Sequence, residues 1–225
     1  MHSHARCRLA VTRVKVCCIK DIAEARLAIA AGASAIGLVS AMPSGPGPID
    51  EETIAEIAAC VPPPIASFLL TCLDDADAII AQQRRCGTST LQLVDAVGPG
   101  VYAKLRSALP GISLVQVVHV IDEGSIEYAC SVATEVDALL LDSGNPRLAV
   151  KELGGTGRRH DWSLSRRIVE CAGKPVFLAG GLNPDNAREA IDAVQPFGLD
   201  LCTGLRTAGS LDPRKLETFM EAVNA

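Results

Sequence analysis

Short apolar runs alternate along the whole chain with longer amphipathic stretches. The apolar runs have the length of buried strands and lie at 13–19, 35–39, 65–70, 90–94, 113–118, 138–142, 176–179 and 198–201. The amphipathic stretches have helical spacing and lie at 21–31, 50–60, 74–86, 98–108, 122–134, 162–172, 183–194 and 212–223. Many begin at a residue that can cap free backbone N–H groups: Asp21, Asp50, Asp74, Asp122, Ser163, Asn183 and Asp212. The pattern predicts eight strand–helix units.

Two architectures can accommodate such units. Continuously apolar strands are buried on both faces, and helical crossovers make neighbouring strands parallel. A doubly wound open sheet would carry a glycine-rich phosphate-binding motif after its first strand, whereas this chain has "CCIKDIA" there. Eight units in 225 residues fit a closed barrel. We therefore predict a single-domain α/β protein with a (β/α)₈ TIM barrel at 13–225, preceded by a flexible N-terminal extension at 1–12.

Composition excludes several kinds of partner. The formal net charge is −5 and no long run of lysine or arginine occurs, so neither nucleic acid nor an anionic membrane is expected as a partner. No apolar run approaches the roughly 18 residues of a membrane span, and the N-terminus lacks the apolar region of a secretory signal. The nine cysteines include no C-x-x-C pair. We expect a cytoplasmic protein in which most cysteines are small apolar side chains, without a metal or cofactor.

The predicted fold indicates where chemistry should occur. Active sites of such barrels lie at the carboxyl ends of the strands and in the loops that follow them. Cys17 ends the first predicted strand and Asp142 the sixth, while Gly180-Gly181 and Thr203-Gly204 follow the seventh and eighth. The longest of these loops, 143–161, contains "GGTGRRHDW" and is the expected lid.

Six segments together resemble the phosphoribosylanthranilate isomerase family, which carries out an Amadori rearrangement in tryptophan biosynthesis. They are "VKVCCI" (14–19), "GASAIGLV" (32–39), "LLLD" (139–142), "GGTGRRHDWSL" (154–164), "LAGGLNPDNAREAI" (178–191) and "DLCTGL" (200–205). The resemblance covers nearly the whole chain. It implies that Cys17 is the general base, that Asp142 is the general acid, and that Gly155 contributes to the phosphate site.

The chemistry of an Amadori rearrangement also calls for an acid and a base of this kind, independently of the resemblance to the family. Opening an N-linked ribose requires an acid at the ring oxygen, and forming the enolamine requires a base at C2′. A buried carboxyl has a raised pKa, as a general acid near neutral pH needs. The alternatives are that Cys17 only packs in the core and that Asp142 only caps the turn "DSGNP".

Alternation along a strand assigns different roles to the adjacent cysteines. If Cys17 points into the barrel, Lys15 does so too and Cys18 faces the helices. A positive charge at Lys15 would favour the thiolate of Cys17. The family usually has glycine at the position of Cys18.

The remaining site residues would hold the substrate. Backbone N–H groups at Gly180, Gly181, Thr203 and Gly204 are expected to bind phosphate, unless these glycines only permit tight turns. Asp200 is expected to hold a sugar hydroxyl or to be an internal polar group of the barrel. The expected partner is a small phosphorylated sugar, and the chain could be a monomer or a homodimer.

Several positions depart from the family at the end that would bind the ring of the substrate. A Ser-x-Arg segment is replaced by Ser44, Pro46 and Gly47, which removes the cation for the anthranilate carboxylate. The family's "QLHG" reads "QLVD", and a glutamate is replaced by Arg206. Arg158 or Arg206 could supply the missing cation. The alternatives are a phosphosugar isomerase with a changed aglycone and a barrel that binds a phosphosugar without turnover.

A Schiff-base aldolase on the same fold is a further alternative. It requires a lysine at the carboxyl end of a strand. None of the lysines has that position: Lys15, Lys20, Lys104, Lys151, Lys174 and Lys215.

Overall fold

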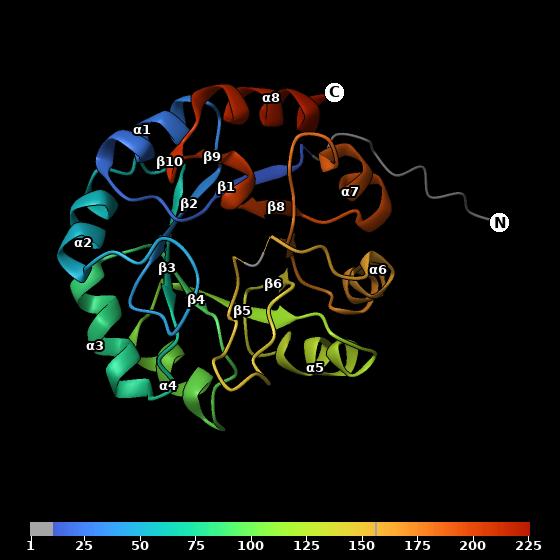
Figure 1. Cartoon of the computed structure of the whole chain (residues 1–225). Helices are drawn as coiled ribbons and strands as arrows, with labels where there is room; N and C mark the ends of the chain where they lie inside the picture. Colours follow the sequence, from blue (N-terminus) through green and yellow to red (C-terminus); the bar gives the residue numbers. More distant parts are fainter. Residues whose placement is uncertain (1–10, 156) are drawn as a thin grey trace.

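Eight parallel strands close into a barrel in the computed structural model, which describes residues 11–155 and 157–225 (Figure 1). The strands are β1 (Arg13–Val16), β2 (Ala35–Val39), β3 (Ala66–Thr71), β4 (Thr90–Leu93), β5 (Ser113–His119), β6 (Ala138–Asp142), β7 (Val176–Leu178) and β8 (Gly198–Leu201). Pairing of β1 with β8 closes the barrel and places Lys15 opposite Asp200. The predicted closed barrel is confirmed, and the alternative of an open sheet is excluded. The predicted extension at 1–12 lies, except for residues 11 and 12, outside the described residues.

A helix follows each strand, and the helices surround the barrel (Figure 1). They are α1 (Ile22–Ala30), α2 (Glu51–Ala59), α3 (Ala76–Cys86), α4 (Val101–Ala108), α5 (Gly124–Val132), α6 (Trp162–Cys171), α7 (Ala187–Val194) and α8 (Pro213–Asn224). Each overlaps its predicted stretch.

The predicted caps are partly right. The side chains of Asp21, Asp50 and Asp212 accept hydrogen bonds from N–H groups in the first turns of α1, α2 and α8. The caps of α3 and α6 are instead Asp75 and Asp161, each near the residue that we predicted. Sequence alone does not separate neighbouring polar residues, because the cap depends on where the backbone leaves helical geometry.

A short insertion between β8 and α8 has no counterpart in the predicted elements. It contains the 3₁₀ helix η1 (Thr203–Leu205) and a hairpin of β9 (Arg206–Thr207) and β10 (Ser210–Leu211). Arg206 in this hairpin forms two hydrogen bonds to the carboxylate of Glu24 in α1, at 3.0 and 2.9 Å. The ion pair therefore ties the end of the barrel to its first helix.

The barrel interior contains apolar side chains and one buried charge pair. Phe68, Val115 and Phe177 belong to the cluster that fills the barrel. Lys15 is fully buried, and its Nζ donates to Asp200 Oδ1 at 2.8 Å. A buried ammonium is tolerated only with such a partner, because desolvation of an isolated charge is very costly. The pair sits just below the end of the barrel where the strands terminate.

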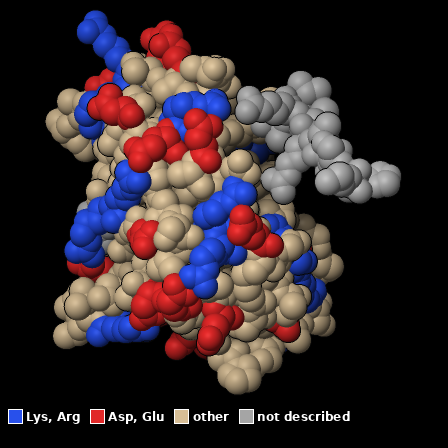
Figure 2. Space-filling model, turned by 90° about the vertical axis from the view of Figure 1, so that its right-hand side faces the viewer, with Lys and Arg blue, Asp and Glu red and all other residues tan. Residues whose placement is uncertain are grey.

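Charged side chains of both signs are intermixed on the face shown in Figure 2. The ion pairs of the protein include Arg166–Glu170 within α6 and Arg188–Asp192 within α7. In each pair the two residues are one helical turn apart. Exposed pairs of this kind each contribute only about 0–1 kcal/mol. None of the helices in the described part of the chain is both long and apolar enough to cross a bilayer.

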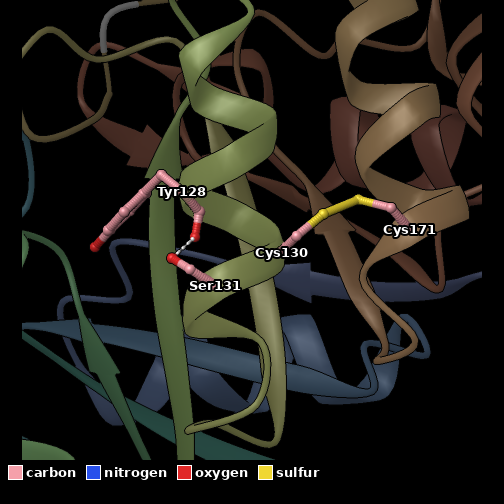
Figure 3. Close-up of a disulfide and its surroundings, with 4 residues drawn as sticks. All are labelled: Tyr128, Cys130, Ser131 and Cys171. Carbon is pink, nitrogen blue, oxygen red and sulfur yellow. Dashed lines mark hydrogen bonds between the residues drawn. A yellow bond between two sulfur atoms is a disulfide. The ribbon is translucent and has the colours of Figure 1, made fainter.

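A disulfide links Cys130 of α5 to Cys171 of α6 across neighbouring helices (Figure 3). Their Cα atoms are 6.3 Å apart, and the residues are separated by 41 positions in the chain. The six other cysteines in the described ranges are free. Cys86 is fully buried, as expected of a small apolar side chain, whereas the bridged pair was not anticipated. The disulfide forms because α5 and α6 pack side by side, and the positions of the cysteines in the sequence do not reveal that packing.

Removing this bridge should lower the free energy of unfolding by up to about 4 kcal/mol, because a cross-link that spans some 41 residues restricts the unfolded chain. Urea unfolding of Cys130→Ser should show a lower midpoint, and reduced wild type should show the same loss. Cys60→Ser is the control, because Cys60 is exposed and free. Unchanged midpoints in both the variant and the reduced protein would contradict the bridge.

Candidate active site

A pocket opens at the carboxyl ends of the strands, and every strand or the loop that follows it contributes to the lining. It is lined by Cys17, Cys18, Val39, Met42, Ser44, Gly45, Pro46, Leu70, Gln92, Val94, Val117, Leu140, Asp142, Leu153, Gly154, Gly155, Gly157, Ala179, Gly180, Asp200 and Cys202. The predicted site residues brought together here are Cys17, Asp142, Gly155, Gly180 and Asp200. Gly181, Thr203, Gly204 and Arg158 are not among the lining residues.

Cys17 lies just beyond β1, and its sulfur faces the buried charge pair. The Nζ of Lys15 donates to Cys17 Sγ at 3.5 Å as well as to Asp200 Oδ1. Burial by itself would lower the pKa of Lys15, but its interactions with Asp200 and Cys17 outweigh that effect and raise the pKa. The ammonium therefore stays charged beside the sulfur. The predicted inward direction of Cys17 is confirmed, and Lys15 lies one layer below it.

Cys18 does not face the helices, so that prediction was wrong. β1 ends at Val16, and Cys18 has a φ of 60°, in the left-handed region. The alternation of side chains holds only within a strand, and it stops before this residue. Cys18 lines the pocket instead, with its Sγ 3.6 Å from the carbonyl oxygen of Pro46. Glycine adopts a left-handed backbone at a lower cost than cysteine does.

Asp142 ends β6 and is buried at the pocket wall. Burial raises its pKa, although a hydrogen bond from the backbone N–H of Ser143 and the proximity of His119 oppose the rise. Gly154 of the lid packs directly on the carboxylate, because a Cβ at this glycine would come within 2.7 Å of Asp142 Oδ2. The pocket that Cys17 lines thus also contains a buried carboxyl group whose pKa is raised above that of a free aspartic acid.

The glycines after β7 and β8 approach neighbouring backbone closely. A Cβ on Gly181, which has a φ of +65°, would lie 2.9 Å from the backbone of Arg158 and Arg159. A Cβ on Gly204 would lie 2.3 Å from the carbonyl oxygen of Leu182. These positions therefore require glycine for packing, whether or not their N–H groups also bind an anion.

The turn before α7 differs from the predicted helix start. Asn183 Oδ1 accepts hydrogen bonds from the N–H groups of Asp185 and Asn186, at 2.9 and 3.2 Å. Asn186 in turn accepts from the N–H of Asn183 and donates to the carbonyl oxygen of Gly181. The helix begins only at Ala187, so Asn183 shapes the turn after the glycine pair rather than capping α7.

Comparison with known proteins identifies the family. Residues 14–222 match the model of N-(5'-phosphoribosyl)anthranilate (PRA) isomerase. The chain belongs to the phosphoribosylanthranilate isomerase family. It is 38% identical to N-(5'-phosphoribosyl)anthranilate isomerase 2 of Methanosarcina mazei, over 92% of each chain. It is 36% identical to the isomerase of Haloferax volcanii, over 94% of this chain and 93% of that protein.

One solved structure similar to this chain contains a bound phosphorylated sugar derivative. It is a phosphoribosyl anthranilate isomerase in complex with reduced 1-(o-carboxyphenylamino)-1-deoxyribulose 5-phosphate. It matches the present barrel with a TM-score of 0.76 and 25% identity, over 95% of this chain and 98% of that one. The resemblance inferred from six sequence segments is thereby confirmed at the level of the family.

The two arginines considered as replacements for the family's cation are both engaged elsewhere. Arg158 forms an ion pair with Glu152 within the lid, and its side chain is 58% exposed. Arg206 is held by Glu24 and donates to the carbonyl oxygen of Cys18. Among the described residues that line the pocket there is no lysine or arginine.

Sequence reasoning missed the contacts that hold the lid over the site. Ser44 donates to the carbonyl oxygen of Lys151 at 2.6 Å, and the Nζ of Lys151 pairs with Asp95. Ser44 and Asp95 lie in two segments that differ from the family, and this difference was the feature of the sequence that could have drawn attention to these contacts. Gln92 was also missed: it lines the pocket, is buried, and its Oε1 has no hydrogen-bond partner within the described ranges.

Proposed function

We propose that this protein isomerises N-(5'-phosphoribosyl)anthranilate to 1-(2-carboxyphenylamino)-1-deoxyribulose 5-phosphate in tryptophan biosynthesis. The observation that carries the proposal is the pairing of a buried thiol beside an ammonium with a buried carboxyl of raised pKa in one pocket at the barrel mouth. Membership of the family supports the substrate class. The reaction consists of proton transfers, so the proposal includes no cofactor.

Asp142 is the general acid in this proposal. Its protonated form donates to the ring oxygen, the bond from that oxygen to C1′ breaks, and a protonated imine and a free 4′-hydroxyl result. Cys17 is the general base and takes the proton from C2′, which gives the enolamine. The ketone forms as the 2′-hydroxyl loses its proton and C1′ gains one, so the number of protons on the substrate is unchanged.

Lys15 and Asp200 support the base. The ammonium of Lys15 lies beside Cys17 Sγ, so a negative charge on the sulfur has a positive neighbour. Asp200 holds the ammonium in place through its Oδ1 and lines the pocket. Its contact with a sugar hydroxyl stays a prediction.

The phosphate group would lie where the loops after β7 and β8 meet the lid. Gly155 and Gly180 line the pocket there. Gly181 follows Gly180 in the chain, and Thr203 and Gly204 follow Cys202, which also lines the pocket. We propose that their backbone N–H groups bind the phosphate, as is common in barrels of this class. Binding of the substrate by Arg158 stays a prediction, since its guanidinium is paired with Glu152.

One observation favours a second candidate, a phosphosugar isomerase with a changed aglycone. The described pocket lining carries no cation for an anthranilate carboxylate, and Pro46 and Gly47 stand where the family has arginine. A lost charged partner costs roughly 1.5–3 kcal/mol, which weakens binding about tenfold or more.

Loss of phosphoribosylanthranilate fluorescence on adding the purified protein tests the proposal directly. We expect turnover, competitive inhibition by inorganic phosphate, and growth of a tryptophan auxotroph that lacks the isomerase when this chain is supplied. Direct binding of inorganic phosphate, measured by calorimetry, together with no turnover would reject anthranilate as the aglycone and support the second candidate. Absence of turnover and of phosphate binding would reject both.

We place the reaction in the cytoplasm, with a phosphorylated sugar as the partner and no role for nucleic acid or membrane. The chain acts as a monomer or a homodimer in this proposal, and analytical ultracentrifugation can distinguish the two.

A further inference from the structure

Two cysteines beside Cys17 have no task in the proposed isomerisation. Cys18 follows β1 and Cys202 follows β8, and both line the active-site pocket with Cys17. The neighbouring thiols of Cys17 and Cys202 both raise the pKa of the Cys18 thiol. All three belong to or pack against the same cluster inside the barrel mouth. Three cysteines therefore line the pocket near the point where β1 and β8 close the barrel.

Strand geometry allows a bond between the two loops. Val16 lies opposite Leu201 in the last register position of β1 and β8, so Cys17 follows opposite Cys202, and Cys18 lies one residue further along the same loop. Neighbouring strands are about 4.7–4.9 Å apart, within the 4.4–6.8 Å that separates Cα atoms in disulfides. Cys17 and Cys18 are adjacent, and consecutive Cα atoms are only about 3.8 Å apart. A bridge between the two loops is thus geometrically favoured over one from Cys18 to Cys17. The Sγ of Cys17 faces the buried Nζ of Lys15 at 3.5 Å, which leaves Cys18 as the partner of Cys202.

The surroundings also make one sulfur of this pair reactive. The neighbouring Cys18 thiol lowers the pKa of Cys202 and, with the nearby guanidinium of Arg206, outweighs the effect of burial. Arg206 is fixed there by the carboxylate of Glu24. The thiolate is the form of cysteine that attacks oxidants, and a positively charged neighbour favours it.

We propose that Cys18 and Cys202 are a redox-sensitive thiol pair that a peroxide converts to a disulfide, which closes the mouth of the active site. The Cys202 thiolate attacks one oxygen of hydrogen peroxide, the O–O bond breaks, Cys202 becomes a sulfenic acid, and the hydroxide that leaves takes a proton from solvent and becomes water. The Cys18 sulfur then attacks the Cys202 sulfur, the S–O bond breaks, and a second water leaves. The two sulfurs lose two electrons in total, and the peroxide gains them.

The bridge would inactivate the enzyme without oxidising Cys17. Cys18 is directly bonded to Cys17 in the chain and sits against the carbonyl oxygen of Pro46 in the β2 loop. Drawing Cys18 toward β8 would therefore shift the loop that carries Cys17 and narrow the pocket. Dithiothreitol should reverse the loss, because reduction restores both thiols.

Mass spectrometry of peroxide-treated full-length protein tests the pair without relying on catalysis. After free thiols are blocked, trypsin should release residues 16–20 joined to residues 189–206, lighter by two hydrogen atoms than the separate peptides. Residues 16–20 contain both Cys17 and Cys18, so fragmentation must show the blocking group on Cys17 and the link on Cys18. A link on Cys17, or no linked peptide while activity is lost, would overturn the proposal.

Two variants separate this bridge from oxidation of Cys17 itself. Cys18→Gly and Cys202→Ser should yield no linked peptide, and each should keep a larger fraction of its own untreated activity after peroxide than the wild type does. Cys60→Ser, at an exposed free cysteine, should behave like the wild type. If both variants lose the same fraction as the wild type, the pair does not control activity. The linked peptide does not depend on the substrate, so it can be found even if the proposed isomerase activity fails.

Discussion

Replacing Asp142 with asparagine should lower kcat for isomerisation by a factor of about 10²–10⁴ while leaving the protein folded and at least as stable as the wild type at neutral pH. Asparagine fills the same space at the end of β6 but has no acidic proton to give. Because the carboxyl is buried and its pKa is raised, its ionised form is unfavourable in the folded state. The asparagine side chain removes that cost.

The pH dependence of both properties has a defined sign. A carboxyl with a raised pKa binds more protons in the folded than in the unfolded protein. Its contribution to stability is fully present below the pKa of about 3.9 of an unfolded aspartic acid and is lost as pH rises through the raised folded value. The advantage of Asp142→Asn in the free energy of unfolding should therefore grow with pH over this window. Activity of the wild type should fall as pH rises through the same folded pKa, because the acid must be protonated.

Stopped-flow fluorescence and urea unfolding at several pH values measure the two effects. Asp77→Asn is a suitable control, because Asp77 is an exposed aspartate that pairs with Lys104 on the outer helices. The control should keep full activity. A loss of activity in Asp142→Asn that parallels a loss of stability at neutral pH would assign this carboxyl a structural role instead.

Replacing Cys17 with serine should also lower kcat by about 10²–10⁴, since a serine hydroxyl does not act as a base near neutral pH. Serine is nearly the same size and can still accept a hydrogen bond from Lys15, so the barrel should remain intact. Competition by inorganic phosphate should persist at the wild-type level. The selective loss of turnover would distinguish a base from a packing residue.

Hydrogen exchange at C2′ provides the sharpest readout for this variant. In deuterated water, the wild type should exchange the hydrogen that the base removes, and Cys17→Ser should not. Cys86→Ser, at a buried cysteine in α3, is the matched control: it should lower stability without altering exchange. Exchange that continues in Cys17→Ser would show that another group takes the C2′ proton.

Much of the fold could be predicted from local patterns. The eight strands and helices follow from apolar periodicity, which depends on residues close in sequence. The positions of Cys17 and Asp142 follow as well, because each ends an apolar run and the ends of parallel strands meet at one mouth. Where a run was extended too far, the prediction failed: β1 ends at Val16 rather than at Ile19, so Cys18 turned to the pocket.

Other features depend on elements far apart in the chain. Three contacts join residues that are far apart in the chain, so no local sequence pattern predicts them. They are the disulfide between α5 and α6, the ion pair of Arg206 with Glu24, and the contact of Ser44 with Lys151. The replacement of glutamate by Arg206 was visible in the sequence, but its partner in α1 was not. The pairing of Lys15 with Asp200 depends on β1 meeting β8, which only closure of the barrel brings about.

The sequence by itself determined the eight-unit barrel, the family, and a thiol and a carboxyl at strand ends, because strand and helix periodicity and motif spacing are properties of neighbouring residues. Only the tertiary structure decided which charged and sulfur groups share the pocket and which cations are committed elsewhere. The physical reason is that hydrogen bonds and ion pairs act over a few ångströms in space, and barrel closure alone brings residues from the two ends of the chain that close together.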